Sequence, residues 1–132
     1  MNAAFALQRA IRAALLADDA VKALLGDPAR VFDAAPADAP TPFAVFSETR
    51  VRPIGPGLCE HDVRLSVQSS YRGRREAQAI LVAIHDALNE RDLAVEGARL
   101  VSLRVVFSDC FWRPEQDRAS GVIRLRAVTE RL

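Results

Sequence analysis

The stretch Gly73-Arg-Arg-Glu-Ala-Gln-Ala-Ile-Leu-Val-Ala-Ile-His-Asp-Ala-Leu-Asn89 decides the fold of this chain. Its apolar residues recur every three or four positions, which predicts a helix with one continuous apolar stripe: Ala77, Ile80, Leu81, Ile84, Ala87 and Leu88. Glu76 follows Gly73 by three residues, where a carboxylate can accept hydrogen bonds from free amides at a helix start. Strand-like segments flank this helix in the chain. A helix with a single apolar face between strands needs a sheet to pack against.

Length and composition limit the class of protein. At 132 residues the chain has room for one modest core, so we expect one domain spanning residues 1–132. Half of the residues are hydrophobic, which argues against disorder, and the formal net charge of +1 gives no overall basic field for nucleic acid. We find no signal peptide and no run of about 18 apolar residues. Cys59 and Cys110 lack the spacing of zinc or redox motifs, so we expect a protein of the reduced cytoplasm with no membrane contact.

Periodicity and turn residues divide the rest of the chain into short elements. Asp18 or Asp19 can cap a second short helix, which Gly26 ends. Prolines among alanines at 33–42 indicate a crossing loop, and the Pro/Gly cluster at 53–57 breaks a strand. The expected elements are helices at 3–16, 19–25 and 73–89, strands at 43–51, 62–68, 101–107 and 121–127, and a long hairpin connection at 109–120. Residues 31–32 could form a further brief strand, which is not counted in the order below.

Alternation within three of these strands predicts a sheet with one apolar and one polar face. The side chains expected on the apolar face are Val63, Leu65 and Val67, then Val101, Leu103, Val105 and Phe107, and finally Ile123, Leu125 and Ala127. The sum is an α+β fold of order αα-β-β-α-β-β, with a mostly antiparallel or mixed sheet and helices packed on one face.

The search for chemistry gives one weak cluster. Cys59 and His61 are separated by one residue, and His85 and Cys110 could join them in a metal site or a Cys-His nucleophilic pair. The alternative is a turn cysteine, a surface histidine and a buried strand cysteine. No nucleophile elbow, phosphate-binding glycine loop or zinc-protease motif is present. We therefore predict no enzyme, no catalytic residue, no metal and no cofactor.

The arginines are more informative. Those on the polar side of their strands should share one sheet face: Arg64, Arg104, Arg124 and Arg126. This face is either solvated, with cross-strand ion pairs of small value, or used against another subunit or nucleic acid. Few aromatic residues accompany these arginines, so base stacking is not supported.

Two further groups are candidates for contact with a partner. Arg72, Arg74 and Arg75 cluster at the start of the central helix, where positive charge is unfavourable against the helix dipole. Trp112, next to Arg113, lies in the 109–120 connection. An exposed tryptophan there indicates an interface, whereas a buried one closes the end of the sheet.

The order of motifs carries a resemblance to a known family. The matching pieces are Arg30-Val-Phe-Asp, Pro36-Ala-Asp-Ala-Pro, Pro42-Phe-Ala-Val-Phe, Glu60-His-Asp-Val-Arg-Leu-Ser-Val-Gln-Ser, Gly73 with Glu76-Ala, and Gly121-Val-Ile-Arg-Leu-Arg-Ala. As an ordered set covering nearly the whole chain, they resemble the tail terminators of long-tailed phages, prophages and gene transfer agents.

The resemblance implies a non-enzymatic virion protein made in the host cytoplasm. Members of that family form a hexameric ring at the head-proximal end of the tail tube, stop tube polymerisation and join the tube to the head connector. The implied partners are further copies of the chain, the major tail tube protein and a connector or stopper protein, with possible DNA contact in the ring lumen. Alternatives are another head-tail connector component or a small ligand- or metal-binding domain.

Overall fold

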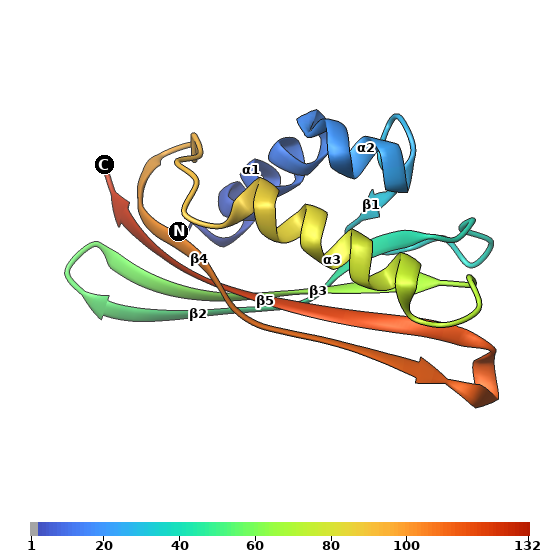
Figure 1. Cartoon of the computed structure of the whole chain (residues 1–132). Coiled ribbons are helices and arrows are strands. Elements are labelled where there is room, and N and C mark those ends of the chain that lie inside the picture. The colour runs from blue at the N-terminus through green and yellow to red at the C-terminus, as the bar shows by residue number, and fades with distance from the viewer. Residues whose placement is uncertain (1–2) are drawn as a thin grey trace.

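The computed structural model describes residues 3–132. Its helices all pack on one face of a five-stranded sheet, and the opposite face is uncovered (Figure 1). The elements are α1 (Ala4–Ala17), α2 (Asp19–Leu25), β1 (Val31–Phe32), β2 (Phe43–Gly55), β3 (Leu58–Ser69), α3 (Arg75–Leu88), β4 (Ala98–Arg113), the 3-10 turn η1 (Pro114–Gln116) and β5 (Arg118–Arg131). The strand order is β1-β2-β3-β5-β4, with β1 and β2 parallel and the other pairs antiparallel. The predicted α+β class and element order are confirmed.

Local sequence explains the two N-terminal helices. The buried residues of α1 recur every four positions and so lie on one side of the helix: Leu7, Ile11 and Leu15. The Asp18 side chain caps α2 by accepting a hydrogen bond from the Val21 amide at 3.0 Å. Gly26 ends α2 with a φ of 95°, in the region that favours glycine. Within residues 3–132 no helix is both long enough and apolar enough to cross a membrane.

α3 lies across the sheet as predicted, and every residue of its apolar stripe is buried. Gly121 of β5 permits this close packing, because a Cβ there would lie 3.0 Å from Cδ1 of Leu81. The predicted cap by Glu76 is wrong. The N-cap is Arg74, so Glu76 is the second helical residue rather than the third, and its carboxylate instead accepts a hydrogen bond from the Ser69 hydroxyl at 2.6 Å.

The predicted alternation is confirmed in β3 and β5 but is wrong in part for β4. Val63, Leu65, Val67, Ile123, Leu125 and Ala127 are all buried beneath the helices. In β4 the pairing with β5 shifts register between Leu100 and Ser102 and again between Val105 and Phe107. Each shift inserts one residue and reverses the alternation that follows it. Leu103 therefore points toward the helices, whereas Phe107 is 51% exposed on the other face.

Two segments that we expected to be loops are largely strand. β2 continues through the expected break to Gly55, and β3 begins at Leu58. β4 extends to Arg113 and β5 begins at Arg118, which leaves only a tight turn of the expected 109–120 connection. Each strand is extended by pairing with its partner, an effect that turn-forming residues do not reveal. The two hairpins turn at opposite ends of the sheet (Figure 1).

The packing of α3 leads to a stability prediction. Ile84→Ala should lower the free energy of unfolding by about 2–5 kcal/mol, because Ile84 is fully buried between helix and sheet. Val82 on the same helix is 60% exposed, so Val82→Ala should change it by less than about 0.5 kcal/mol. Urea denaturation of both variants measures the difference. Equal losses would show that α3 does not pack by this stripe.

Candidate functional site

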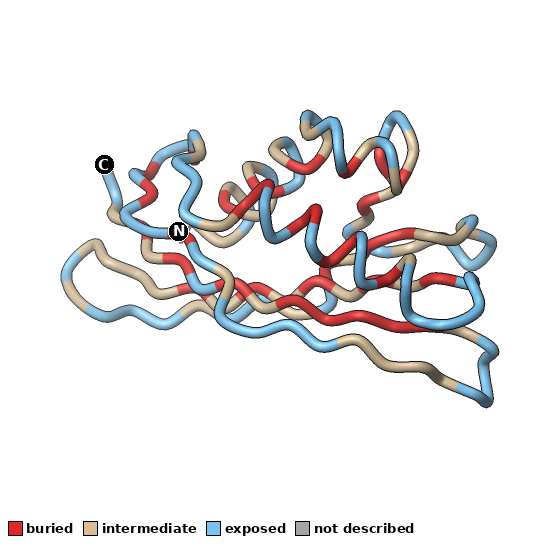
Figure 2. Tube along the Cα trace, viewed as in Figure 1, coloured by how far each residue is buried: buried red, intermediate tan, exposed pale blue. Residues whose placement is uncertain are grey.

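The candidate site is the face of the sheet that the helices leave free, which we call the uncovered face. β5 lies between β3 and β4 and is buried along most of its length, whereas β4 at the edge is mainly exposed or intermediate (Figure 2). Side chains on the uncovered face therefore meet solvent or a partner. This face is available for contacts because the core lies entirely on the other side.

Strand register brings the four predicted arginines together on the uncovered face. Arg64 of β3 lies directly opposite Arg124 of β5, and Arg126 of β5 lies directly opposite Arg104 of β4. Residues 124 and 126 are two positions apart on one strand, so the two arginine pairs form adjacent rows. We call these four residues the arginine cluster. Its existence was predicted from alternation, but its pairing depends on register.

Arginines near the cluster form ion pairs with carboxylates, whereas the members of the cluster do not. Arg50 Nε lies 3.0 Å from Glu48 Oε1, Arg52 lies 2.8 Å from Glu60, and Arg99 lies 2.9 Å from Glu130. Among residues 3–132, no carboxylate lies within ion-pair distance of any member of the arginine cluster. The Arg50–Glu48 pair lies within β2, whereas Arg52 pairs with Glu60 across two strands. The expectation of a solvated face with cross-strand ion pairs therefore fits the sheet near Arg52 but not its centre.

The row formed by Arg64 and Arg124 is also partly enclosed. The Nε atoms of both residues are buried and have no hydrogen-bond partner within the described chain. Arg64 and Arg124 border a hollow of about 190 Å³, which is also lined by Phe107, Asp109, Phe111 and Val122. Two fixed positive charges therefore face a small space that contains one carboxylate. Such a space can accept an anion.

The family is shown by comparison with known proteins. Residues 9–130 match the family model described as "Tail completion protein gp17". The chain belongs to this family. It is 28% identical to a chain of a solved structure described as "Virion of native gene transfer agent (GTA) particle", with a TM-score of 0.83 and 94% of each chain covered. No curated protein matches the chain.

These findings confirm the family resemblance stated from the sequence. They identify a structural tail protein of phage-like particles and a component of the virion. Our prediction that the chain is not an enzyme agrees with membership of a structural family.

The other predicted contact residues of this tail completion protein gather at one end of the sheet. Arg72, Arg74 and Arg75 are exposed at or just before the start of α3. The Arg74 carbonyl oxygen lies 3.8 Å from Sγ of Cys110 on β4, so the start of α3 sits beside the β4–β5 hairpin. Sequence reasoning treated these arginines and the hairpin as separate candidates. The fold makes them neighbours.

The hairpin itself presents different side chains on its two sides. Trp112 lies opposite Ala119 on the helix side and is half-buried, which is between the two outcomes that we considered. Arg113 lies on the uncovered face, where its guanidinium is 4.9 Å from the centroid of the Phe111 ring and its Nε donates a hydrogen bond to Ser120 Oγ at 3.2 Å. Both residues belong to β4 and precede the turn at Pro114–Gln116.

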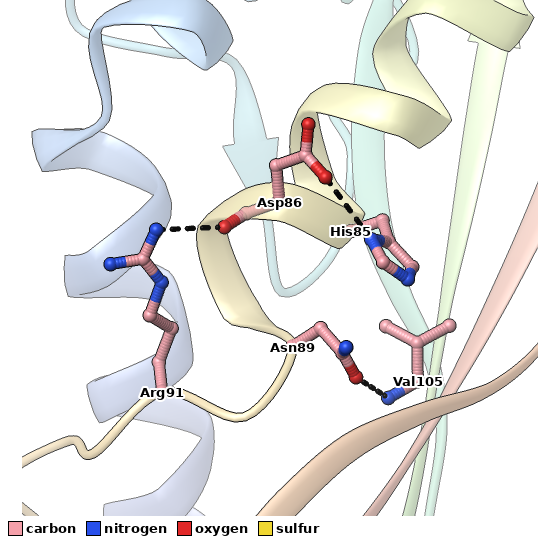
Figure 3. Close-up of polar contacts among 5 residues, drawn as sticks. All are labelled: His85, Asp86, Asn89, Arg91 and Val105. Carbon is pink, nitrogen blue, oxygen red and sulfur yellow. Dashed lines mark hydrogen bonds and ion pairs between the residues drawn. The ribbon is translucent and has the colours of Figure 1, made fainter.

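The predicted metal candidates of the tail completion protein do not converge. His61 is buried on the helix side of β3, while His85 is on the exposed side of α3 with Nδ1 3.2 Å from Asp86 Oδ1 (Figure 3). Cys59 and Cys110 are both free, and they lie on different strands. Across residues 3–132 no group of three His, Cys, Asp or Glu side chains is arranged to hold a metal ion.

Residues that follow α3 protect part of the sheet edge. The Asn89 side chain accepts a hydrogen bond from the Val105 amide at 2.9 Å (Figure 3). The Glu90 amide donates to the Leu103 carbonyl at 2.8 Å. These bonds satisfy backbone groups of β4 that would otherwise be open to another strand. No local sequence pattern indicates this contact, because it joins the end of a helix to a strand that follows it in the chain.

A second hollow, of about 890 Å³, lies at the opposite end of the molecule and was not predicted. It is bordered by the start of α1, the β2–β3 turn, residues 96–98 at the start of β4 and the end of β5, and its lining includes Phe5, Leu58, Cys59 and Thr129. Small side chains such as Ala6 and Gly57 leave the space. No motif marks it, because its walls come from four separate elements.

Burial of His61 leads to a prediction about pH. Its Nε2 lies 2.8 Å from Thr129 Oγ1, its Nδ1 has no partner among the described residues, and burial lowers the pKa of His61 below 6.5. Well above pH 6.5 the imidazole is neutral in both the folded and the unfolded chain, so it adds no pH dependence to the free energy of unfolding there. Below that pH the unfolded chain binds the proton first, so folding stability falls by at most about 1.4 kcal/mol per pH unit until the native pKa is reached.

His61→Gln should remove this part of the pH dependence. Denaturation of wild type and variant between pH 7.5 and about 5 measures it. His85→Gln, at the exposed histidine, is the matched control and should keep the steeper wild-type profile. Parallel profiles for wild type and His61→Gln would contradict the role assigned to the buried imidazole.

Proposed function

We propose that this tail completion protein is the tail terminator of a phage or gene transfer agent. It forms a ring at the head-proximal end of the tail tube, stops tube polymerisation and joins the tube to the head connector. The uncovered face is the observation that carries the proposal, because a chain with one buried sheet face leaves a whole second face for assembly. The family membership and the similar chain in a gene transfer agent virion support it.

The shape of the protomer suits a cyclic assembly. The sheet ends laterally in β4 on one side, and on the other side β1 covers only the start of β2 at Ala44 and Val45. The two lateral sides therefore differ, which favours head-to-tail contacts that close into a ring over a two-fold dimer. Exposed apolar side chains at these sides include Ile54, Val101, Val106 and Phe107. A stable contact of this kind buries on the order of 1,200–2,000 Å².

The two hairpin ends supply surfaces for two different partners. The β4–β5 end carries Arg72, Arg74, Arg75, Trp112 and Arg113, whereas the β2–β3 end carries the hollow beside α1. Because these ends lie at opposite ends of the sheet, a ring would present one to the tail tube and the other to the connector. We place the uncovered face toward the lumen through which DNA passes, since the helices then form the outer wall.

Assembly measurements test the terminator role directly. Light scattering over a concentration range, alone and with the major tail tube protein, should show a discrete ring with the mass of six copies. The protein should also limit tube length when it is added during tube polymerisation. Trp112→Ala should weaken tube or connector binding, while Val82→Ala, exposed on α3 away from both ends, should assemble as wild type.

Two results separate the terminator from its alternatives. The terminator role would be excluded if the protein stayed monomeric at high concentration, formed no ring with the tube protein and did not shorten the tubes. Binding to the connector without any effect on tubes would indicate another head-tail connector component. Electron microscopy of tubes with the protein added identifies which end it occupies.

A further inference from the structure

The centre of the uncovered face contains an arrangement that folding alone does not explain. Arg64 and Arg124 are directly opposite each other on neighbouring strands, and like charges in this position are destabilising. Both Nε atoms are also buried without a hydrogen-bond acceptor in the described chain. Buried donors are normally satisfied, so an acceptor from outside the chain is the simplest partner for both.

The space beside these atoms fits a small tetrahedral anion. The hollow of about 190 Å³ bordered by both arginines has room for about six water molecules at roughly 30 Å³ each. Its walls are Phe107, Phe111 and Val122, with one carboxylate, Asp109. Asp109 offsets one of the two positive charges, so the arginine pair keeps a net positive charge that attracts an anion.

The charges continue beyond this pair. Arg126 follows Arg124 by two residues on β5, or about 7 Å at the usual strand rise, and it lies opposite Arg104. Two carboxylates border the rows, because Glu48 lies directly opposite Arg64 and Asp62 lies directly opposite Arg126. Glu48 is paired with Arg50, and neither carboxylate forms an ion pair with the cluster among the described residues. Four arginines in two adjacent rows suit a polyanion better than a single carboxylate from a partner.

We propose that Arg64 and Arg124 together bind a backbone phosphate of DNA, with Arg104 and Arg126 contacting the adjoining backbone. Guanidinium groups bind phosphate oxygens bidentately, and backbone contacts carry no sequence information. The inference deepens the proposed terminator role and rests on it for the presence of DNA at this face. Contact is independent of base sequence, so it suits any genome that passes along the ring.

DNA-binding measurements on the full chain test the pair. The probe is a labelled mixed-sequence duplex of 24 base pairs, titrated at several salt concentrations. Arg124→Gln should weaken binding at least 10-fold at low salt and should reduce the slope of log affinity against log salt by about 1. Arg52→Gln is the matched control, because it removes the same charge from the same face at a residue already paired with Glu60.

Thermal stability without DNA gives a second, opposite readout. Arg124→Gln should leave the melting temperature unchanged or raise it, because it relieves repulsion from Arg64. A lowered melting temperature together with wild-type DNA binding would assign the pair to folding and overturn the inference. Equal loss of DNA binding in Arg52→Gln would overturn it as well, since only the overall charge would matter.

Assembly measured on the same variants keeps this inference distinct from the terminator role. Ring formation by the wild type with no salt-dependent DNA binding would overturn the phosphate site and leave the ring intact. DNA binding through Arg124 by a protein that never forms a ring would support the phosphate site and overturn the terminator role. Loss of the ring in Arg124→Gln with wild-type DNA affinity would mean that the pair meets a carboxylate of a neighbouring subunit.

Discussion

The packing of α3 on the inner face of the sheet is the contact on which the other features depend. Ile80, Ile84 and Leu88 are almost completely buried against strands whose own inward side chains are aliphatic. Gly121 lets the helix approach β5 closely, because Leu81 occupies the space that a Cβ would fill. With all three helices committed to one side, the core contributes nothing to the other face. That face is free to carry charges that a core could not tolerate.

The uncovered face shows a balance between stability and function. Arg50 and Arg52 have carboxylate partners, as expected of an exposed sheet surface. The arginine cluster does not, and two of its members place buried donors beside each other. Departures from local consistency of this kind are expected at functional sites, where a partner supplies the missing interactions.

The β4 edge of the sheet has one part that other residues of the chain protect and one part that is exposed. Asn89 and Glu90 occupy backbone groups of β4 near its middle, so this part of the edge cannot pair with another strand. Beyond this region β4 continues as an arm with β5, and two register shifts turn Phe107 outward. The contacts of Asn89 and Glu90 therefore limit edge pairing in the middle of β4, while the part of β4 beyond them stays exposed or half-buried.

Sequence alone determined the helices, the element order and the faces of β3 and β5, because these follow from periodicities set by neighbouring residues. It also placed the arginine cluster on one face and supported the family. Tertiary structure decided what depends on pairing between distant segments: the register that sets Arg64 against Arg124, the shifts in β4, the length of both hairpins and the meeting of Arg74 with Cys110. Register and bulges are chosen by the whole sheet, since each strand fixes its neighbours, and no local pattern carries that information.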